Sequence, residues 1–309
     1  MRRILAAALL VLGCASCAKH DEKLQLALNW KPEPEFGGIF EAERLGAFAK
    51  HGLAVERTGG PGAPVVQMVT AKQVPFGIAS ADEVVLARDR GSDVVAVFAT
   101  YQTNPQGLMT HAARKLDTLE ALLHSPGTLA VEPGLPYVKF LEQRYGFGAL
   151  NVVPYSYSIA PFLTDPTLTQ QVFVTAEPIA ARRAHADPQV FLVAESGYDP
   201  YTAVVIVHGD MLRNDGARVA SFVAALREGW RSYLDDPGPA NAVMAPLNPE
   251  MDADAFRLAA EAQKPLIDVP GGALGEMTAE RWAELAGQLQ RLGLVKDVQP
   301  AASYFANPR

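Results

Sequence analysis

Cysteine is scarce in this 309-residue sequence: the two cysteines, Cys14 and Cys17, both lie near its beginning. The folded part therefore cannot rest on disulfides and must be stabilised by a hydrophobic core. The C-x-x-C spacing leaves a redox or zinc site as a competing interpretation, but no second cysteine pair and no histidine cluster follows it. Histidines occur without metal-ligand spacing, at positions 20, 51, 111, 124, 185 and 208. We predict neither a bound metal nor a cofactor.

Basic residues are also fewer than acidic residues. Lysine and arginine number 27 against 34 aspartate and glutamate residues, so the formal net charge is -7. A protein that binds the phosphate backbone needs a basic patch, and the sequence has no basic stripe of this kind. Nucleic acid is therefore not an expected partner.

Apolar runs long enough to span a bilayer are missing as well. The run Ile4–Leu12 is too short, because a membrane-spanning helix takes about 20 residues. Two arginines precede this run and small residues follow it, a pattern typical of an export signal. Val11–Cys14 resembles a bacterial lipoprotein processing box, which predicts acylation of Cys14 or, alternatively, Cys17. We expect residues 1–17 to be a signal and anchor region, and the protein to lie in the periplasm or cell envelope, anchored to the membrane by lipid.

The sequence does contain many hydrophobic residues, 49%, with 20% charged, as in a well-packed soluble protein. The stretch 28–53 is its clearest unit. Alternating apolar residues predict a strand that ends at Trp30, and Pro32 and Pro34 prevent its continuation. Apolar residues at three- and four-residue steps then predict a helix over 39–49. This combination is how open α/β sheets form one wall of a ligand-binding crevice.

Strand and helix patterns continue to alternate up to residue 99. Predicted strands span 53–57, 74–78 and 93–99, and helices begin near 65 and 81. Ser80 and Glu83 have the spacing of a capping box at the start of the second of these helices. The strand 93–99 is apolar almost throughout, which is typical of a parallel strand covered on both faces. Repeated β-α units predict a doubly wound sheet.

A second set of units begins after a break at 103–107. It comprises strands at 128–131, near 152, at 172–175 and at 190–193, and helices at 116–123, 136–146 and 179–185. The strand 203–207 returns to the first sheet, and helices follow at 216–234, 253–265 and 278–292. These patterns predict an α/β protein with two doubly wound lobes and a helical C-terminal part.

The predicted lobe 1 comprises residues 24–104 and 203–309, and lobe 2 comprises residues 105–202. Two crossings join them, near 104–108 and 199–203, and would serve as hinges. Two lobes on hinges leave a cleft between them, and such an architecture suits closure around a small molecule.

The order and spacing of six segments resemble one family. The segments are NWKPEPEFGGIFEAERLGAFAKHGL, GGPGAPVVQMV, FGIASADEVVLARDRG, PGLPYVKFLEQRYG, QQVFVTAEP and GYDPY. The resemblance is to the NMT1/THI5-like, or SsuA/ThiY-like, group of ABC importer solute-binding proteins, which includes binders of thiamine precursors, nitrate, sulfonates and taurine. It implies a type II periplasmic-binding-protein fold, a monomer, and ABC permease and ATPase subunits as partners.

Trp30 is the first candidate ligand contact. Its indole could cap the core or stack on a planar ligand, and the resemblance implies stacking, because the matching position commonly faces the cleft. Glu35 lies in the same loop, where a solvated acid is the alternative. The other candidates in lobe 1 are Phe36, Gly37, Ser80, Ala81, Asp82 and Gln102. Helix-start glycines and a helix cap are sufficient structural roles for several of these, and Gln102 could instead satisfy hinge backbone groups.

Glu177 is the strongest candidate in lobe 2. It follows a buried strand, where an unpaired carboxylate is costly, so it should find a donor. A helix N-terminus could supply that donor, or a ring N–H or amine of the ligand could. The remaining candidates in lobe 2 are Gly134, Tyr137, Tyr155, Tyr157 and Tyr198. A surface loop explains Tyr155 and Tyr157 equally well, and hinge packing explains Tyr198.

The expected cleft is aromatic and acidic. Binders of nitrate or sulfonate need positive charge or many donors, and here only Lys31 and Arg88 lie near the assigned loops. A planar heteroaromatic ligand therefore fits better, first a thiamine-related pyrimidine and second a flavin-like or other ring. An anion remains the alternative, because helix N-termini alone can bind anions.

Catalysis is not expected. The fungal relatives of this family include a pyrimidine synthase, but its cysteine-rich motif is absent from this sequence. Neither a G-x-S-x-G motif nor a P-loop lysine occurs. A sensor subunit that signals without transport is the remaining alternative.

Overall fold

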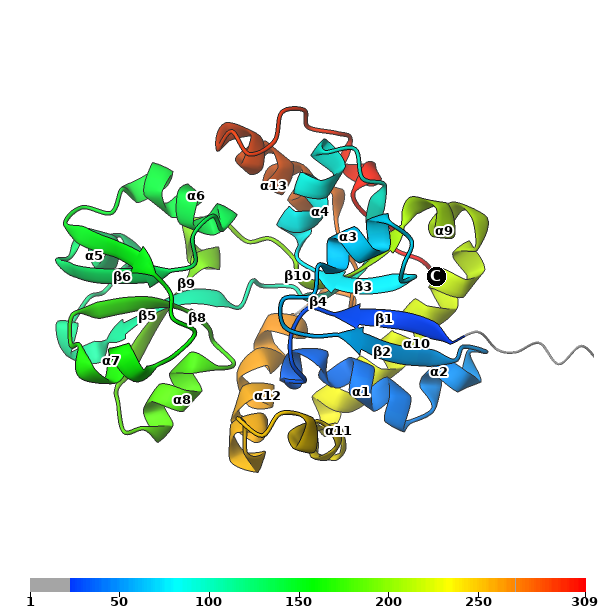
Figure 1. The fold of residues 1–309 in the computed structure, drawn as a ribbon, viewed down its shortest axis with the longest axis horizontal. Coiled ribbons are helices and arrows are strands. Elements are labelled where there is room, and N and C mark those ends of the chain that lie inside the picture. The colour runs from blue at the N-terminus through cyan, green and yellow to red at the C-terminus, as the bar shows by residue number, and fades with distance from the viewer. Residues whose placement is uncertain (1–22, 270) are drawn as a thin grey trace, which may run out of the picture.

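Two lobes, each built on a five-stranded sheet, form the computed structural model, which describes residues 23–269 and 271–309 (Figure 1). The middle of the chain forms the lobe at the left of Figure 1, and its two ends form the lobe at the right. Helices cover the faces of both sheets. Cys14 and Cys17, with the predicted signal and anchor region, lie outside the described residues.

The sheet of lobe 1 has the strand order β2-β1-β3-β10-β4. Its strands are β1 (Leu24–Leu28), β2 (Val55–Gly59), β3 (Phe76–Ala79), β4 (Val94–Tyr101) and β10 (Thr202–His208). β1 pairs in parallel with β2 and β3, whereas β10 lies antiparallel between β3 and β4. The predicted return of β10 to the first sheet is confirmed. The prediction of β4 as a parallel strand is wrong: its apolar run reflects burial of every residue, whatever the direction of its partner.

The sheet of lobe 2 has the order β7-β6-β8-β5-β9. Its strands are β5 (Gln106–His111), β6 (Gly127–Val131), β7 (Leu150–Pro154), β8 (Leu168–Phe173) and β9 (Pro188–Leu192). The sequence did not predict β5, which contains a glycine, has few β-branched residues and follows the turn pair Asn104-Pro105. It forms because it lies antiparallel between β8 and β9. Both sheets are therefore mixed rather than purely parallel.

Most predicted helices are present with small shifts in their ends. Lobe 1 contains α1 (Gly37–Arg44), α2 (Ala47–Lys50), α3 (Val65–Thr70), α4 (Ala81–Asp89), α9 (Gly209–Asn214), α10 (Gly216–Asp235), α11 (Gly238–Met244), α12 (Ala253–Ile267) and α13 (Ala279–Arg291). Lobe 2 contains α5 (Leu119–His124), α6 (Pro136–Tyr145), α7 (Ala160–Thr164) and α8 (Glu177–Arg183). The capping box of α4 is confirmed. The predicted helix 39–49 instead breaks into α1 and α2 at Gly46, whose φ is +66°.

The chain crosses between the lobes at residues 102–105 and 197–201. Arg281 of α13 ties the two crossings together. Its guanidinium donates to the carbonyl oxygens of Gln102, at 2.5 Å, and Asp199, at 2.7 Å. The Asp199 carboxylate in turn accepts the Asn104 N–H at 2.7 Å. The last long helix therefore fixes the geometry of the hinge in addition to packing on lobe 1.

Helix α1 approaches α10 closely because both helices carry glycine at the contact. A Cβ atom at Gly38 would lie 2.3 Å from the Trp230 ring, and one at Gly229 would lie 2.2 Å from the Gly38 carbonyl oxygen. A Cβ atom at Gly37 would lie 2.2 Å from the ring of Tyr233. The paired glycines that open α1 are therefore required by helix packing.

None of the helices within the described ranges is both long enough and apolar enough to cross a membrane.

The close approach of α1 and α10 predicts that Gly38→Ala destabilises the fold. The added methyl group would overlap the Trp230 ring, so we expect the free energy of unfolding to fall by about 1–3 kcal/mol. Urea denaturation would measure the change. Gly216→Ala is the matched control, because a Cβ atom there meets no atom within 4 Å. Equal loss of stability in both variants would contradict the packing role.

Candidate ligand-binding site

The loop between β1 and α1 carries the first group of candidate residues. Pro34 opens a short 3₁₀ helix (η1, Pro34–Phe36), so the strand stops and the loop is stiff. Trp30 is half-buried, and its Nε1–H donates to Oε1 of Glu33 at 3.2 Å. This contact fixes the indole against an acid that the sequence analysis did not single out.

Glu33 and Glu35 are two partly buried acids in this loop. Burial raises the pKa of Glu33 to about 7, against the smaller opposing effects of Lys31 and the Trp30 hydrogen bond. Burial raises the pKa of Glu35 to about 8, and the charge of Glu33 adds to the shift. Their carboxyl groups lie deep among neighbouring atoms although part of each side chain is exposed. The loop therefore holds two acids that can carry protons near neutral pH.

Lys31 is the cation beside these acids. Its ammonium lies 5.7 Å from the centroid of the Trp30 ring and forms an ion pair with Glu250 from the segment before α12. Because Glu250 already takes this charge, the loop offers little free positive charge to an anionic ligand.

Glu177 presents an acid from the opposite lobe. It is the first residue of α8, and its carboxylate accepts the Tyr155 hydroxyl at 2.8 Å and the Phe173 N–H at 2.8 Å. Burial nevertheless raises the pKa of Glu177. The protein thus supplies a side-chain hydroxyl, which the sequence analysis did not anticipate, and a backbone N–H, and the acid is still costly to ionise.

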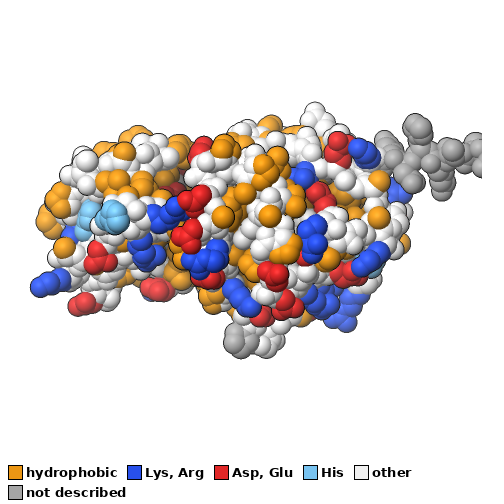
Figure 2. All heavy atoms as spheres, turned by 90° about the horizontal axis from the view of Figure 1, so that it is seen from below, with side chains coloured by type: hydrophobic (Ala, Val, Ile, Leu, Met, Phe, Trp, Pro, Cys, Tyr) orange, Lys and Arg blue, Asp and Glu red, His pale blue; other side chains and the backbone are white. Residues whose placement is uncertain are grey.

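The two lobes bring these groups close to one another. The charge of Glu177 contributes to the raised pKa of Glu33, and Lys31 acts on both acids, so the three lie within electrostatic reach across the junction. Tyr137 lies close enough to Glu177 that its own pKa is raised further by that charge, after the larger effect of burial. Figure 2 shows acidic and basic side chains gathered where the lobes adjoin. We call the following set the acid–aromatic group: Trp30, Glu33, Glu35, Tyr137, Tyr155 and Glu177.

Several predicted site residues lie instead at the crossings. The Tyr198 hydroxyl donates to Asp82 Oδ2 at 3.2 Å, and Asp82 also accepts the Ser80 hydroxyl. The Ala81 N–H donates to the Tyr201 carbonyl at 3.0 Å. The Gln102 amide donates to two backbone carbonyls, those of Ala99 and Glu276, each at 3.2 Å. These contacts give Ser80, Ala81, Asp82, Gln102 and Tyr198 structural partners at the hinge, and their contact with a ligand stays a prediction.

The other predicted residues have packing roles, lie in a turn, or are exposed at the surface. Phe36 is fully buried in the lobe 1 core, and the Gly37 N–H donates to the Pro34 carbonyl, so neither offers a free group in this structure. Tyr157 is 61% exposed, with its ring 5.2 Å from that of Tyr155. Gly134 has φ +88° in the turn before α6, a conformation that favours glycine. Whether these residues touch a ligand stays a prediction.

Sequence reasoning missed Glu33, Thr175 and Asn248. Glu33 is two residues before Glu35 in the same Pro/Glu loop, so the run of acids was a usable signal. Thr175 is buried beside the Tyr101 hydroxyl at the junction. Asn248 donates to Glu33 from the other end of the chain, and no local pattern marks it.

A groove of about 560 Å³ lies elsewhere on lobe 1, between the end of α10, α11 and α12. Its walls share no residue with the acid–aromatic group. We do not assign the ligand to it, because titratable groups with raised pKa and aromatic rings converge at the junction of the lobes instead.

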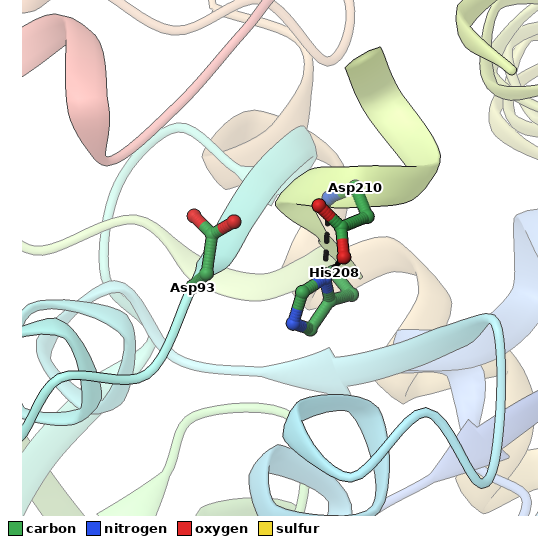
Figure 3. Close-up of side chains that lie close together, drawn as sticks. All are labelled: Asp93, His208 and Asp210. Carbon is green, nitrogen blue, oxygen red and sulfur yellow. Dashed lines mark hydrogen bonds and ion pairs between the residues drawn. The ribbon is translucent and has the colours of Figure 1, made fainter. Parts of the chain in front are cut away.

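One cluster has the composition of a metal site, formed by Asp93, His208 and Asp210 (Figure 3). Arg213 bridges its two carboxylates at 2.6 and 2.5 Å, and Lys72 pairs with Asp210 at 2.5 Å. His208 Nδ1 accepts the Asp210 N–H at 3.1 Å. The ligand atoms are already neutralised or engaged, so the cluster is explained as an ion-pair network that joins the starts of β4 and α9.

Comparison with known proteins places this architecture in one family. A family model described as NMT1/THI5 like matches residues 33–240. The chain belongs to the NMT1/THI5-like family. An NMT1/THI5-like relationship also fits the similarity to the formylaminopyrimidine-binding protein of Halalkalibacterium halodurans, which is 22% identical over 314 residues, 93% of this chain and 92% of that protein.

Solved structures confirm the periplasmic-binding-protein fold for this NMT1/THI5-like chain. The periplasmic aliphatic sulphonate binding protein SsuA from Escherichia coli matches with a TM-score of 0.72 at 13% identity, over 93% of each chain. The alkanesulfonate-binding protein SsuA from Xanthomonas axonopodis pv. citri, bound to MOPS, matches with a TM-score of 0.65 at 11% identity, over 92% of this chain and 98% of that one.

The raised pKa values predict how stability depends on pH. Between the unfolded value near 4.5 and the folded values of about 7 and 8, the folded state holds protons that the unfolded state has lost, so stability falls as pH rises. Glu35→Gln should reduce this slope by up to about 1.4 kcal/mol per pH unit, an upper bound because the side chain is partly exposed. Denaturation curves at pH 5, 6.5 and 8 would measure it, with the exposed Glu142→Gln as control. An unchanged slope in Glu35→Gln would contradict the burial of this acid.

Proposed function

We propose that this protein is the solute-binding component of an ABC importer and that it binds a planar heteroaromatic ligand bearing N–H donors, neutral or cationic, between its lobes. The family and the fold support the general role, since the curated relative is named as a binding protein. Binding, closure and delivery require no chemical step from the protein. We expect permease and ATPase subunits as partners, a monomer, and a location in the periplasm or cell envelope.

The acidic character of the junction is the observation that carries the choice of ligand. Glu33, Glu35 and Glu177 supply carboxylate oxygens from both lobes, and burial raises the pKa of each. A ligand with amino or ring N–H groups would give these oxygens hydrogen bonds in place of those to water. An aminopyrimidine has such donors, and the curated relative is named for a formylaminopyrimidine.

Trp30 would contribute aromatic stacking to ligand recognition. Its ring is flat, half-buried and held by Glu33, so it is pre-organised to stack on an aromatic ligand. Tyr137 and Tyr155 stand near Glu177 on the other lobe and would close over the opposite side. A flavin-like ring would satisfy the same features and is the second choice.

A sulfonate, taurine or nitrate ligand is the competing proposal, since SsuA proteins have the same fold. An oxyanion needs unpaired donors or positive charge. Lys31 is paired with Glu250, and Arg88 is engaged by Asp93, the Val94 carbonyl and Gln299 at a distance from the acid–aromatic group. In their ionised form the acids would repel such a ligand, so the heteroaromatic is favoured.

A ligand screen tests this proposal. We expect thermal-shift assays to give a stabilising hit among aminopyrimidines, with thiamine and riboflavin as further heteroaromatics, and no comparable shift with nitrate, taurine or alkanesulfonates. Ligand binding to the folded state raises the melting temperature through mass action. Tight binding of a sulfonate or nitrate without any heteroaromatic hit would overturn the choice of ligand. Conversion of the ligand during incubation, followed by mass spectrometry, would instead indicate an enzyme.

Substitution of Trp30 tests the stacking. Trp30→Ala should weaken binding of the aminopyrimidine hit by at least about tenfold, because both the stacked surface and the extra aromatic interaction are lost. Trp30→Phe keeps a ring but loses the N–H that contacts Glu33, so a smaller loss is expected. Calorimetric titration would measure both. Unchanged affinity in Trp30→Ala would rule out stacking on this indole.

A further inference from the structure

The segment Asn248–Asp252 connects the short 3₁₀ helix η4 (Ala245–Leu247) to α12. It lies beyond residue 240, where the match to the family model ends. Three of its side chains make polar contacts outside the segment: Asn248 and Glu250 reach the loop before α1, and Asp252 reaches the end of α8 in lobe 2.

Asn248 holds the loop that carries Trp30. It is 1% exposed, and its Nδ2 donates to the Pro32 carbonyl at 3.1 Å and to Glu33 Oε1 at 3.4 Å. The same oxygen of Glu33 accepts the Trp30 N–H. The buried amide and the indole thus share one carboxylate oxygen, and loss of the amide would leave Glu33 with a single side-chain donor.

Glu250 forms an ion pair with Lys31, the cation of the same loop. Its carboxylate pairs with Lys31, whose ammonium lies beside the Trp30 ring. Lys31 also lies within electrostatic reach of Glu33 and Glu177. The ion pair therefore holds the Lys31 ammonium near the Trp30 ring.

Asp252 reaches across to lobe 2. As the N-cap of α12 it accepts the Ala255 N–H at 2.9 Å, and both its carboxylate oxygens take the guanidinium of Arg183, with Nη1 to Oδ1 at 2.6 Å. Arg183 is the last residue of α8, the helix that begins at Glu177. A bidentate ion pair of this geometry is the strong form of an exposed salt bridge.

Helix α12 connects this segment to the loop before α1 and to the hinge. Its Gln263 is fully buried, accepts the Tyr101 hydroxyl at 2.8 Å and donates to the Pro34 carbonyl at 2.8 Å. The Leu266 carbonyl accepts the N–H groups of Gln102 and Thr103 in the first crossing. A shift of α12 would therefore change its contacts with the loop before α1, with the hinge and with lobe 2 at the same time.

We propose that the Asn248–Asp252 segment couples closure of the lobes to the ligand-binding loop, with Asn248 as a positioning residue for Trp30 and Glu33, and the Asp252–Arg183 ion pair as the latch that keeps lobe 2 closed. The ligand side of this inference rests on the proposed function. The latch itself does not require a ligand, so it can be tested on the protein alone.

The latch is tested by the distance between the lobes. Spin labels are attached at Leu163→Cys on α7 and Val243→Cys on α11, two positions that are 43% and 42% exposed. The native cysteines are removed by Cys14→Ser and Cys17→Ser, so no other cysteine is labelled. Pulsed electron paramagnetic resonance then measures the distance between the two labels. Asp252→Asn retains the helix cap but loses the charge. In the absence of ligand, we expect Asp252→Asn to have a longer interlobe distance than the wild type. Arg183→Gln should show the same increase, and the double variant should show no further increase.

Arg182→Gln is the matched control, since Arg182 is the exposed neighbour of Arg183 on α8. An interlobe distance that is unchanged in Asp252→Asn, or that changes equally in Arg182→Gln, would overturn the latch. With a formylaminopyrimidine as the probe, Asp252→Asn should raise the dissociation rate of the ligand about two- to fivefold relative to the wild type. This increase should be smaller at high salt, because salt screens the exposed ion pair.

Positioning by Asn248 is tested by fluorescence quenching. Trp230 and Trp282 are buried at 1% and 0% exposure, so acrylamide quenching reports chiefly on Trp30. Asn248→Ala should increase quenching and weaken binding of the formylaminopyrimidine about tenfold. Asn241→Ala is the control, because it removes a buried amide whose partner is Tyr233 rather than the loop.

Equal quenching in the wild type and Asn248→Ala, or an equal increase in the control, would overturn the positioning role. A formylaminopyrimidine that fails to bind the wild type would count against the proposed ligand class, whereas the ligand-free distance and quenching measurements would still decide for or against the segment.

Discussion

Carboxylates that lose contact with water need donors, and this requirement shapes the junction of the two lobes. Glu33 and Glu35 come from lobe 1 and Glu177 from lobe 2, and burial raises the pKa of all three. The protein supplies part of the compensation through Trp30 and Tyr155. Under the proposed function, an N–H-bearing ligand would offer these acids further donors.

Hinge geometry decides whether the acids of the two lobes can meet at all. The chain crosses between the sheets twice, and Arg281 of α13 binds backbone carbonyls of both crossings. Tyr198 in the second crossing donates to Asp82 of α4 in lobe 1. A hinge of this kind restricts the relative motion of the lobes, and short contacts at its edge can then bias closure.

The C-terminal helices do more than cover lobe 1. α13 binds both crossings, while α12 and the segment before it contact the loop before α1 through Asn248 and Gln263, and lobe 2 through Asp252. This part of the chain lies beyond the match to the family model.

The sequence alone determined most of the elements and their order, because apolar periodicity, prolines and the Ser80 capping box act over a few residues. It also identified Trp30 and Glu177 as candidates, since each follows a strand. The tertiary structure alone decided the antiparallel pairing of β4, the formation of β5, and the contact of Asn248 with Glu33 across 215 positions. The physical reason is that strand partners and buried hydrogen bonds join residues far apart in the chain, whose meeting depends on how the whole core packs.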